Sequence, residues 1–360
     1  MKICLAIHSL QAGGMERVMS ELANYFSIKK NGEVNIILYG ITREVFYPVS
    51  EAIQIHKPGF EFKSKIRVWS TLRSLLYLRQ TIKKLQPDTI LSFGEYWNSF
   101  VLIAAFGLKF PVFISDRAQP NKPLHGIAGR LRKILYPRAR GMIAQTNTAK
   151  KLYCQDKLND NIQVIGNPIR QIPYSDQTNV ENNVLMVGRF INSKNQDVLI
   201  KIFSKINNPE WNLVLVGYDH LQQENEHKLK SLAKELGIEN RVIFAGKQSN
   251  IEDYYQEAKI FAFTSISEGF PNVIGEAMSA GLPVVAFDCV AGPSEMINNG
   301  RNGFLIPLFD EELFLDKLNL LIENESMRIK MGKKAREDIQ QFSIHTVGDQ
   351  FYNFITGNTN

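Results

Sequence analysis

Short apolar runs rich in Val, Ile and Leu alternate with segments of helical periodicity along the whole chain. This alternation is typical of β-α-β units, whose parallel strands are buried on both faces and therefore read as continuous hydrophobic runs. A first set of runs occupies residues 3–8, 34–39, 89–93, 112–115, 142–145 and 162–165. A second set occupies residues 183–187, 212–216, 241–245, 260–264 and 283–287. The pattern predicts two open, mostly parallel α/β sheets in tandem.

The segment between the two sets has the composition of a turn followed by a linker. Residues 166–170 read Gly-Asn-Pro-Ile-Arg, and the polar residues 175–183 follow. Few contacts cross such a segment, so we expect an N-terminal domain at 1–170 and a C-terminal domain at 171–342. We also expect a helix at 343–357 to return to the first domain. Ligands bind at the carboxyl ends of the strands in such sheets, so two facing domains with a cleft between them would accommodate two substrates.

Composition narrows the class of protein. Of the 360 residues, 44% are hydrophobic, which is enough for two buried cores. Cys4, Cys154 and Cys289 are odd in number, and their spacing fits neither a zinc cluster nor a disulfide framework, so we expect a reducing cytosolic setting. The longest apolar stretch, residues 101–108, is far shorter than the ~20 residues of a spanning helix, so we expect no membrane crossing.

The charge is distributed unevenly between the two halves. Residues 1–170 carry 25 Lys and Arg against 11 Asp and Glu, whereas residues 171–360 carry 17 against 25. A basic half indicates an anionic partner: nucleic acid, an anionic membrane surface or a phosphorylated substrate. Residues 63–84 contain several cations and no acid, interleaved with apolar residues. They predict a basic amphipathic helix that either lies on an anionic bilayer or packs its apolar residues into the first domain.

The strongest chemical motif is residues 267–278, which read Ser-Glu-Gly-Phe-Pro-Asn-Val-Ile-Gly-Glu-Ala-Met after an apolar strand. Pro271 suits the first position of a helix, so backbone N–H groups near Gly269, Phe270, Pro271, Asn272 and Val273 would gather at a helix N-terminus. Such a terminus binds anions, and a diphosphate is a natural occupant. Glu268 and Glu276 would flank it as acceptors for sugar hydroxyls, although most glutamates are simply solvated. The pairing favours a nucleotide-sugar.

Two further motifs follow strands. Gly188 and Arg189 stand at the end of the first strand of the second set, and Lys194 follows five residues after Arg189. The two cations could neutralise a departing diphosphate. Gly13-Gly14-Met15-Glu16-Arg17 opens the first helix, and its adjacent glycines let the backbone approach a ligand. This is not the G-x-G-x-x-G fingerprint, so a nicotinamide or flavin cofactor loses its main support.

Together these three motifs resemble those of family 4 glycosyltransferases, which have the GT-B fold of two Rossmann-like domains and serve lipid-linked glycan, capsule or O-antigen assembly. The resemblance covers nearly all of the chain and rests on the Glu268 to Glu276 pattern above all. It implies a retaining glycosyltransferase that moves a hexose or N-acetylhexosamine from a UDP-sugar to a glycan or polyprenyl-diphosphate-linked acceptor. It further implies a cytoplasmic enzyme that is peripheral on the inner face of the cell membrane.

The resemblance also implies roles for individual residues. Glu276 would hold the ribose hydroxyls, Glu268 would contact the donor sugar, and Arg189 with Lys194 would grip the diphosphate. Donor binding would also involve Gly14, Gly188, Lys247 and the 269–273 backbone, whereas Gly13, Glu16 and Arg117 would lie on the acceptor side. Many relatives place a His where this chain reads Ser115-Asp116-Arg117, which leaves the identity of the sugar open.

No cofactor is expected. Such enzymes generally need no metal, and the chain has no Asp-x-Asp pair that could hold a divalent ion against a diphosphate. The cations and the helix dipole would then stabilise the leaving group. Two alternatives stay open: a UDP-sugar epimerase with the same architecture, and a nucleic-acid-binding protein that uses the basic half, although we find no recognition module for nucleic acid.

Overall fold

The computed structural model describes residues 1–40, 44–173, 180–219 and 224–357. Residues 175–179 of the predicted linker lie outside these ranges. The chain divides into two compact units: an N-terminal unit of Met1–Pro168 with Ile344–Asn360, and a C-terminal unit of Ile169–Ser343. The chain therefore returns to its first unit through helix α13 (Ile344–Thr356).

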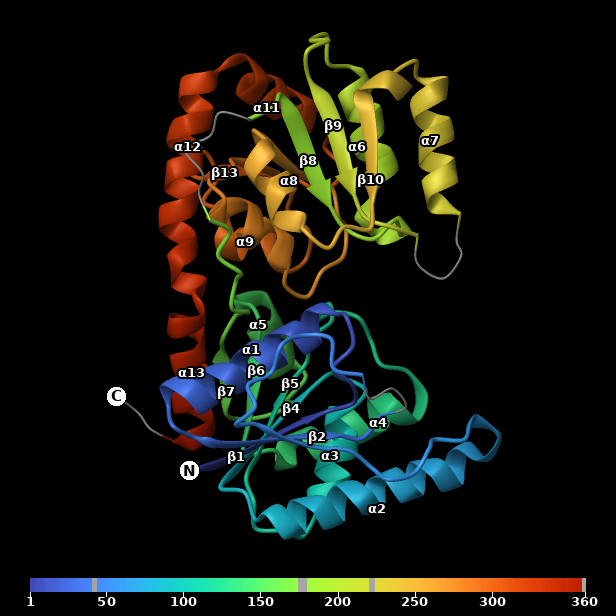
Figure 1. The fold of residues 1–360 in the computed structure, drawn as a ribbon, viewed down its shortest axis with the longest axis vertical. Coiled ribbons are helices and arrows are strands. Elements are labelled where there is room, and N and C mark those ends of the chain that lie inside the picture. Colours follow the sequence, from blue (N-terminus) through green and yellow to red (C-terminus); the bar gives the residue numbers. More distant parts are fainter. Residues whose placement is uncertain (41–43, 174–179, 220–223, 358–360) are drawn as a thin grey trace. The chain divides into compact units, whose positions relative to one another are not determined.

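The described residues of the N-terminal unit form a seven-stranded parallel sheet in the order β3-β2-β1-β4-β5-β6-β7 (Figure 1). Its strands are β1 (Lys2–Ile7), β2 (Glu33–Leu38), β3 (Gln54–His56), β4 (Thr89–Phe93), β5 (Val112–Ser115), β6 (Gly141–Ala144) and β7 (Ile162–Val164). The strand order reverses between β1 and β4, which makes their carboxyl ends the switch point where α/β sheets bind ligands.

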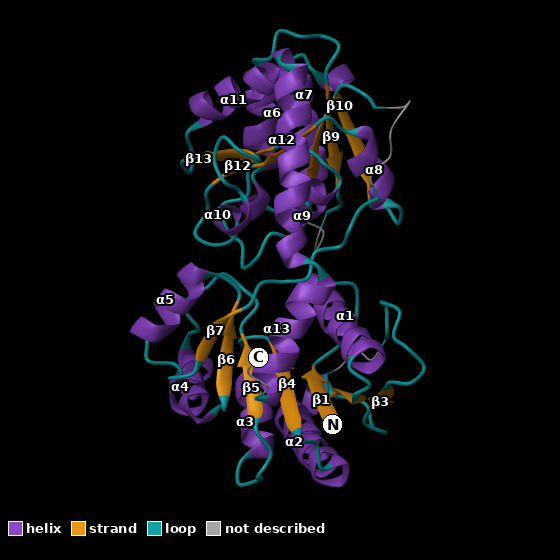
Figure 2. Cartoon of the chain, turned by 90° about the vertical axis from the view of Figure 1, so that its left-hand side faces the viewer, coloured by secondary structure: helices purple, strands orange, loops and turns teal. Residues whose placement is uncertain are grey.

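Helices cover both faces of this sheet (Figure 2). They are α1 (Gly14–Lys29), α2 (Arg67–Leu85), α3 (Asn98–Ala105), α4 (Gly126–Leu135), α5 (Asn147–Gln155) and α13, with the short 3₁₀ turns η1 (Ser64–Ile66) and η2 (Tyr136–Arg138). Aromatic side chains dock α13 on the sheet: the rings of Phe351 and Phe93 lie 6.0 Å apart, and those of Phe354 and Phe113 lie 5.2 Å apart. The amphipathic C-terminal helix thus completes the hydrophobic core of the N-terminal unit.

The described residues of the C-terminal unit form a six-stranded parallel sheet in the order β10-β9-β8-β11-β12-β13. Its strands are β8 (Asn183–Val187), β9 (Asn212–Val216), β10 (Val242–Gly246), β11 (Ile260–Phe263), β12 (Val284–Phe287) and β13 (Gly303–Ile306). Here the order reverses between β8 and β11, so the carboxyl ends of these two strands form the switch point of the second unit.

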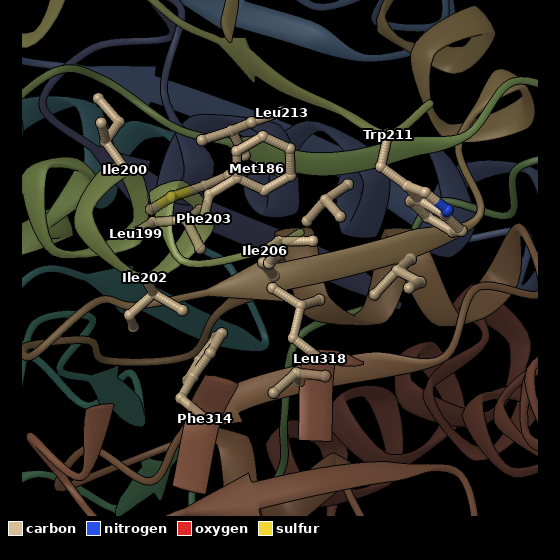
Figure 3. Packing of buried hydrophobic residues seen from close by; sticks show 14 of the residues in the cluster. Met186, Leu199, Ile200, Ile202, Phe203, Ile206, Trp211, Leu213, Phe314 and Leu318 are labelled. Atoms are coloured by element: carbon tan, nitrogen blue, oxygen red, sulfur yellow. The ribbon is translucent and has the colours of Figure 1, made fainter. Parts of the chain in front are cut away.

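The helices of this unit are α6 (Gln196–Ser204), α7 (Asn225–Glu235), α8 (Ile251–Glu257), α9 (Asn272–Ser279), α10 (Pro293–Met296), α11 (Glu311–Glu323) and α12 (Glu325–Asp338), with the 3₁₀ turns η3 (Asn192–Lys194), η4 (Glu239–Arg241) and η5 (Ile339–Phe342). Figure 3 shows one part of the core, in which Phe203 of α6, Leu213 of β9 and Leu318 of α11 pack together. A core of this kind holds the strand ends in place, because close-packed side chains resist displacement.

The predicted fold class, an α/β chain with two Rossmann-like parallel sheets, is confirmed. The hydrophobic pattern missed two strands, β3 and β13. Each is short and lies at an edge of its sheet. Strand β3 reads Gln-Ile-His and is not fully buried, so it lacks the apolar run of a central strand, whereas β13 reads Gly-Phe-Leu-Ile and is apolar but only four residues long. In the described ranges, no helix is both long enough and apolar enough to cross a membrane.

Candidate functional site

Two of the predicted motifs meet at the switch point of the C-terminal unit. Residues 188–195 follow β8 and residues 264–271 follow β11, and these strands are neighbours in the sheet. The Ile266 N–H donates to the Ser193 carbonyl at 2.9 Å, and the Thr264 hydroxyl donates to the Lys194 carbonyl at 3.1 Å. One backbone and one side-chain hydrogen bond therefore join the two loops into one structure.

Lys194 and Glu268 form an ion pair across this junction. Lys194 Nζ lies 2.5 Å from Glu268 Oε1, and both side chains are mostly buried. The ammonium also lies 5.9 Å from the centroid of the Phe263 ring. A Cβ at Gly188 would lie 3.6 Å from Lys194 Cδ and Cε, which is an ordinary van der Waals distance. Gly188 therefore lies next to Lys194, but packing against the lysine does not require a glycine there. The sequence predicted that these residues act together, and the structure brings the cation and carboxylate into contact.

Arg189 lies on the same loop but is differently placed. Arg189 is exposed, and its backbone carbonyl accepts a hydrogen bond from Gln196 Nε2 at 2.9 Å. Within the described ranges its guanidinium has no hydrogen bond or ion pair. The backbone of Arg189 is therefore anchored while its charged group stays available to an anion.

Helix α9 begins at Asn272, one residue later than predicted, because Pro271 has non-helical backbone angles of φ −81° and ψ 81°. The Asn272 amide donates to the Phe270 carbonyl at 3.0 Å, so this predicted anion donor already has a protein acceptor. Phe270 is buried, with its ring 5.5 Å from that of Phe342. Gly292, at φ +111°, packs on the turn: a Cβ there would lie 2.1 Å from Pro271 Cδ. The loop after β12 thus supports the start of α9 and needs glycine.

Glu276 is buried, with only 8% of its surface exposed. Its Oε2 accepts a hydrogen bond from the Tyr255 hydroxyl at 3.0 Å, and Tyr255 is itself fully buried on α8. Glu276 is therefore not a solvated surface glutamate. Sequence reasoning missed Tyr255, because nothing in its local pattern separates it from an ordinary core aromatic.

Gly246 and Lys247 lie where β10 ends. Gly246 has φ +70° and coincides with a shift of register against β9. Lys247 is exposed, and its Nζ lies 5.3 Å from the centroid of the Tyr218 ring. At the end of β9, a Cβ on Gly217 would lie 1.9 Å from the Gly188 carbonyl oxygen, so the chain approaches itself too closely there for a side chain.

The remaining predicted residues belong to the N-terminal unit, where Gly13 precedes α1 and Gly14 begins it. The Gly13 N–H donates to the Tyr47 hydroxyl at 3.2 Å. Glu16, in the first turn, lies 3.8 Å from His8 Nε2. Burial raises the pKa of Glu16 and lowers the pKa of His8, so burial disfavours the charged form of each.

An aromatic stack completes this second switch point. The His8 ring, after β1, stacks on the Trp97 ring, after β4, at 4.9 Å between centroids and 10° between planes. Sequence reasoning did not pair these residues, which lie far apart in the chain. The N-terminal switch point is therefore aromatic and weakly charged.

Arg117 follows β5 and turns its guanidinium inward. Nη2 donates to Asn167 Oδ1 at 2.6 Å and Nη1 donates to Ser115 Oγ at 3.2 Å, while the guanidinium lies 4.1 Å from the Phe93 ring centroid. Burial lowers the pKa of Arg117 to about 9, which leaves the side chain cationic near neutral pH. Neutral protein groups thus hold this predicted acceptor-side residue.

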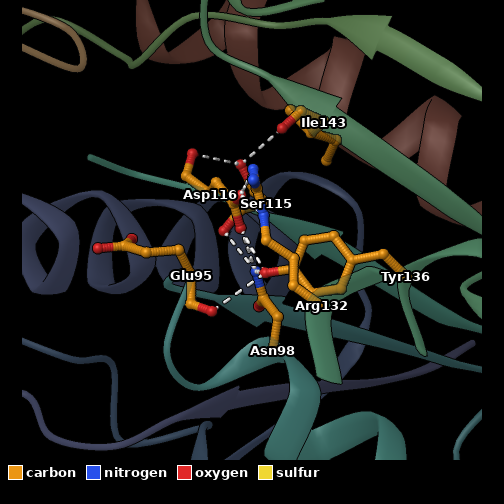
Figure 4. A network of polar contacts seen from close by, with 7 residues as sticks. All are labelled: Glu95, Asn98, Ser115, Asp116, Arg132, Tyr136 and Ile143. Carbon is orange, nitrogen blue, oxygen red and sulfur yellow. Dashed lines mark hydrogen bonds and ion pairs between the residues drawn. The ribbon is translucent and has the colours of Figure 1, made fainter. Parts of the chain in front are cut away.

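Beside it, Asp116 is the centre of a buried polar network that the sequence did not reveal (Figure 4). Its carboxylate accepts hydrogen bonds from Arg132 at 2.6 Å, from Tyr136 at 2.6 Å and from Asn98 at 2.9 Å. The Tyr136 hydroxyl also lies 3.2 Å from the Glu95 carbonyl, and burial raises the pKa of the Glu95 carboxyl. Asp116 and Arg132 thus neutralise each other's charge within the N-terminal unit.

Among the described residues, no group of three or more His, Cys, Asp or Glu side chains is arranged to hold a metal ion. Of the predicted site residues, the structure joins Lys194 with Glu268 and places Arg189 on the same loop. Gly13, Gly14, Glu16 and Arg117 lie in the other unit. Their roles toward a ligand stay predictions.

Two family models match the chain. Residues 12–170 match the model described as Glycosyltransferase Family 4, and residues 171–338 match the model described as Glycosyl transferases group 1. Together they span nearly all of both sheets.

Whole-chain relatives agree with this match. An uncharacterized glycosyltransferase of Haemophilus influenzae is 30% identical over 345 residues, which cover 94% of this chain and 95% of that protein. The GalNAc-alpha-(1->4)-GalNAc-alpha-(1->3)-diNAcBac-PP-undecaprenol alpha-1,4-N-acetyl-D-galactosaminyltransferase of Campylobacter jejuni is 26% identical in an alignment of 363 positions that covers 99% of this chain and 98% of that one. The solved structure of Anabaena HepE in complex with UDP-glucose has a TM-score of 0.81 at 21% identity, covering 99% of this chain and 100% of that one, which shows a shared fold.

Proposed function

The chain belongs to glycosyltransferase family 4, and we propose that it transfers a hexose or N-acetylhexosamine from a UDP-sugar to a lipid-linked glycan acceptor. That it is a glycosyltransferase follows from the family. The proposal concerns its donor, acceptor and chemistry. The observation that carries it is the junction of the β8 and β11 loops, where Lys194, Glu268 and the exposed Arg189 gather at a switch point.

A UDP-sugar fits the charges of this junction. Arg189 and Lys194 supply two cations for the diphosphate, and the start of α9 adds the positive end of a helix dipole. Glu276, held by Tyr255, would accept the ribose hydroxyls, and Glu268 would accept hydroxyls of the donor sugar. The complex of the similar Anabaena protein with UDP-glucose supports this choice of donor.

In the proposed reaction an acceptor hydroxyl oxygen bonds to the anomeric carbon while the bond from that carbon to the diphosphate oxygen breaks. UDP leaves with the bonding electrons, and the hydroxyl proton passes to the departing phosphate or to solvent. Arg189 and Lys194 would stabilise the negative charge that develops on the diphosphate, a role that needs no metal ion. Retention of anomeric configuration is proposed on the resemblance to the family.

The acceptor is proposed from the relatives. The Campylobacter jejuni enzyme is named for an undecaprenol diphosphate acceptor, and that lipid resides in a membrane. We therefore place this enzyme in the cytoplasm, peripheral to the inner face of the cell membrane. The excess of positive charge in residues 1–170 favours contact with an anionic membrane surface. We propose no role for nucleic acid.

One assay tests the proposal. The protein is incubated with a panel of UDP-sugars and a membrane lipid extract, and the products are weighed by mass spectrometry, with and without a chelator. We expect free UDP, an acceptor longer by one sugar and no effect of the chelator, and NMR of the new linkage gives the anomer. An isomerised UDP-sugar with no lengthened acceptor would instead indicate an epimerase. A water-soluble acceptor in place of the lipid-linked one would refute the acceptor class.

A further inference from the structure

Helix α2 buries a polar stripe and exposes large apolar side chains. Ser70, Ser74, Leu78 and Ile82 recur every four residues and are buried, so they define the inner face. On the other side, Val68 is 76% exposed, Trp69 66%, Leu72 47% and Leu76 57%. In its first half the helix thus buries Ser70 and Ser74, with Leu75 partly buried against the core, and turns most of its large apolar residues outward, unlike an ordinary surface helix.

Isolated exposed apolar residues are common on soluble proteins, but a contiguous row is not. Trp69, Leu72 and Leu76 are spaced by three and four residues, so they lie next to each other along one face. Exposure of such a row to water is unfavourable by the hydrophobic effect, which indicates that another surface covers it in use.

The same face is cationic. Between Glu61 and Asp88 the chain has no acidic residue. The cations in this interval are Lys63, Lys65, Arg67, Arg73, Arg79, Lys83 and Lys84. By the helical repeat, Lys83 lies on the same side of α2 as Leu72 and Leu76. Lys65 is exposed on the turn η1, directly before the start of the helix. A tryptophan and leucines among lysines and arginines are the composition of a helix that lies in a membrane interface.

The cationic apolar surface continues beyond α2. Arg79 Nη1 donates to the Ala104 carbonyl at 2.9 Å and to the Phe106 carbonyl at 2.7 Å, which ties the helix to the end of α3. Phe106 is 64% exposed. It borders a cavity of about 500 Å³ whose lining includes Lys109, Arg138 and Arg140 and no acidic residue. Such a cavity is suited to a phosphate-bearing headgroup.

We infer that the outward face of α2 docks on an anionic lipid bilayer, with Trp69, Leu72 and Leu76 at the acyl boundary and the surrounding cations among the headgroups. The inference deepens the proposed function, on which it rests for the presence of a membrane-borne acceptor. Charge complementarity favours a bilayer over a second copy of this chain, because two copies facing through α2 would oppose their cations.

The test uses the full chain and vesicles of phosphatidylcholine with or without phosphatidylglycerol. We expect co-sedimentation with the anionic vesicles only, weakened by salt because surface charges are screened. The double variant Lys65→Glu with Lys83→Glu should lower the partition coefficient by roughly tenfold or more. The matched control, Lys234→Glu with Lys330→Glu, changes the net charge equally at exposed sites of the C-terminal unit and should leave binding near the wild-type level.

Tryptophan fluorescence gives a second readout. Of the three tryptophans, Trp69 is largely exposed, Trp211 is buried and Trp97 is partly buried against His8, so insertion should shift the emission to shorter wavelength mainly through Trp69. Trp69→Phe should abolish most of the shift while keeping the protein folded, as circular dichroism would verify. A shift that persists in this variant would overturn the proposed orientation.

Other outcomes also decide the inference. Equal binding to neutral and anionic vesicles, or equal losses in the two double variants, would refute it. A concentration-dependent dimer that Trp69→Ala dissolves would show that a second copy covers this face, and would refute it too. Vesicle binding does not require turnover. Vesicle binding without glycosyl transfer would refute the proposed function alone. Transfer to a lipid-linked acceptor in detergent, without vesicle binding, would refute the docking face alone.

Discussion

The two sheets have the same parallel topology but place charge differently at their switch points. In the C-terminal unit, Lys194 and Glu268 pair across the junction of two loops and Arg189 extends beside them without a protein partner in the described ranges. In the N-terminal unit, His8 stacks on Trp97, and the nearby Asp116 satisfies its charge with Arg132.

The two switch points therefore suit different kinds of ligand. An uncompensated arginine and an exchangeable ion pair suit a multiply charged ligand such as a diphosphate, because the ligand can replace Glu268 as the partner of Lys194. The stacked rings of His8 and Trp97 suit an uncharged ligand rich in hydroxyls and C–H groups.

The largest effect is expected for Asp116→Ala, which tests whether the Asp116 network stabilises the fold. Asp116→Ala leaves Arg132 buried without its carboxylate, so the free energy of unfolding of the N-terminal unit should fall by about 3–5 kcal/mol. Hydrogen exchange measured by mass spectrometry would show faster exchange in β4 to β6 and unchanged rates in the C-terminal unit. Asp197→Ala, which removes an exposed pair with Lys201, is the control and should change little. Equal effects of the two substitutions would show that the Asp116 network is not specially stabilising.

Lys194→Ala tests whether the switch point of the C-terminal unit binds the diphosphate. Loss of one preorganised group that stabilises the leaving diphosphate should lower turnover roughly 10²- to 10³-fold at temperatures where the variant is folded. The melting temperature should also fall, because Glu268 loses its mostly buried partner. Initial rates with a UDP-sugar donor measure the first effect and calorimetry the second. Lys201→Ala, an exposed lysine on the adjoining helix, should retain full activity. If Lys194→Ala turned over normally, the diphosphate would have to bind elsewhere.

Tyr255→Phe sharpens the role assigned to Glu276. The substitution removes the hydrogen bond that holds the Glu276 carboxylate, so UDP should bind about tenfold more weakly, since a bond to a charged group contributes ~1.5–3 kcal/mol. Isothermal titration calorimetry with UDP gives the affinity directly. Tyr254→Phe, the neighbouring residue on α8, is the matched control. Unchanged affinity in Tyr255→Phe would separate Glu276 from nucleotide binding.

The smallest effect is expected for the more exposed ion pair of Arg301 and Asp338, in contrast to the buried pair of Arg132 and Asp116. Arg301 donates two hydrogen bonds to Asp338 at 2.9 Å, and these bonds hold the pKa of Asp338 below its ordinary value. The resulting stability is present above the ordinary aspartate pKa and is lost as the pH falls through the lower folded-state pKa. Asp338→Asn should therefore cost about 0.5–1 kcal/mol at neutral pH, as expected for an exposed pair. Urea unfolding at neutral and strongly acidic pH should show this difference disappearing in acid; a constant difference would contradict the linkage.

Local pattern predicted much of the fold and part of the candidate site. The central strands appear as apolar runs because each is buried on both faces, and Glu268 and Glu276 stand out because they border a strand-to-helix turn. Pairings between distant segments were not predictable in the same way. The Thr264 hydroxyl donates to the Lys194 carbonyl although the two residues lie about seventy positions apart in the chain, and no local feature near Thr264 predicts that contact. Tyr255 was missed for the same reason.

The amino-acid sequence by itself determined the parallel α/β class, the order of the central strands along the chain and the excess of positive charge in the first half. Hydrophobic periodicity and charge are properties of neighbouring residues, so they can be read directly. Only the tertiary structure decided which charges are neutralised and which stay available. Asp116 and Arg132 become buried partners, Arg189 stays exposed, and Trp69 faces outward, because strand order and helix packing decide which distant side chains meet.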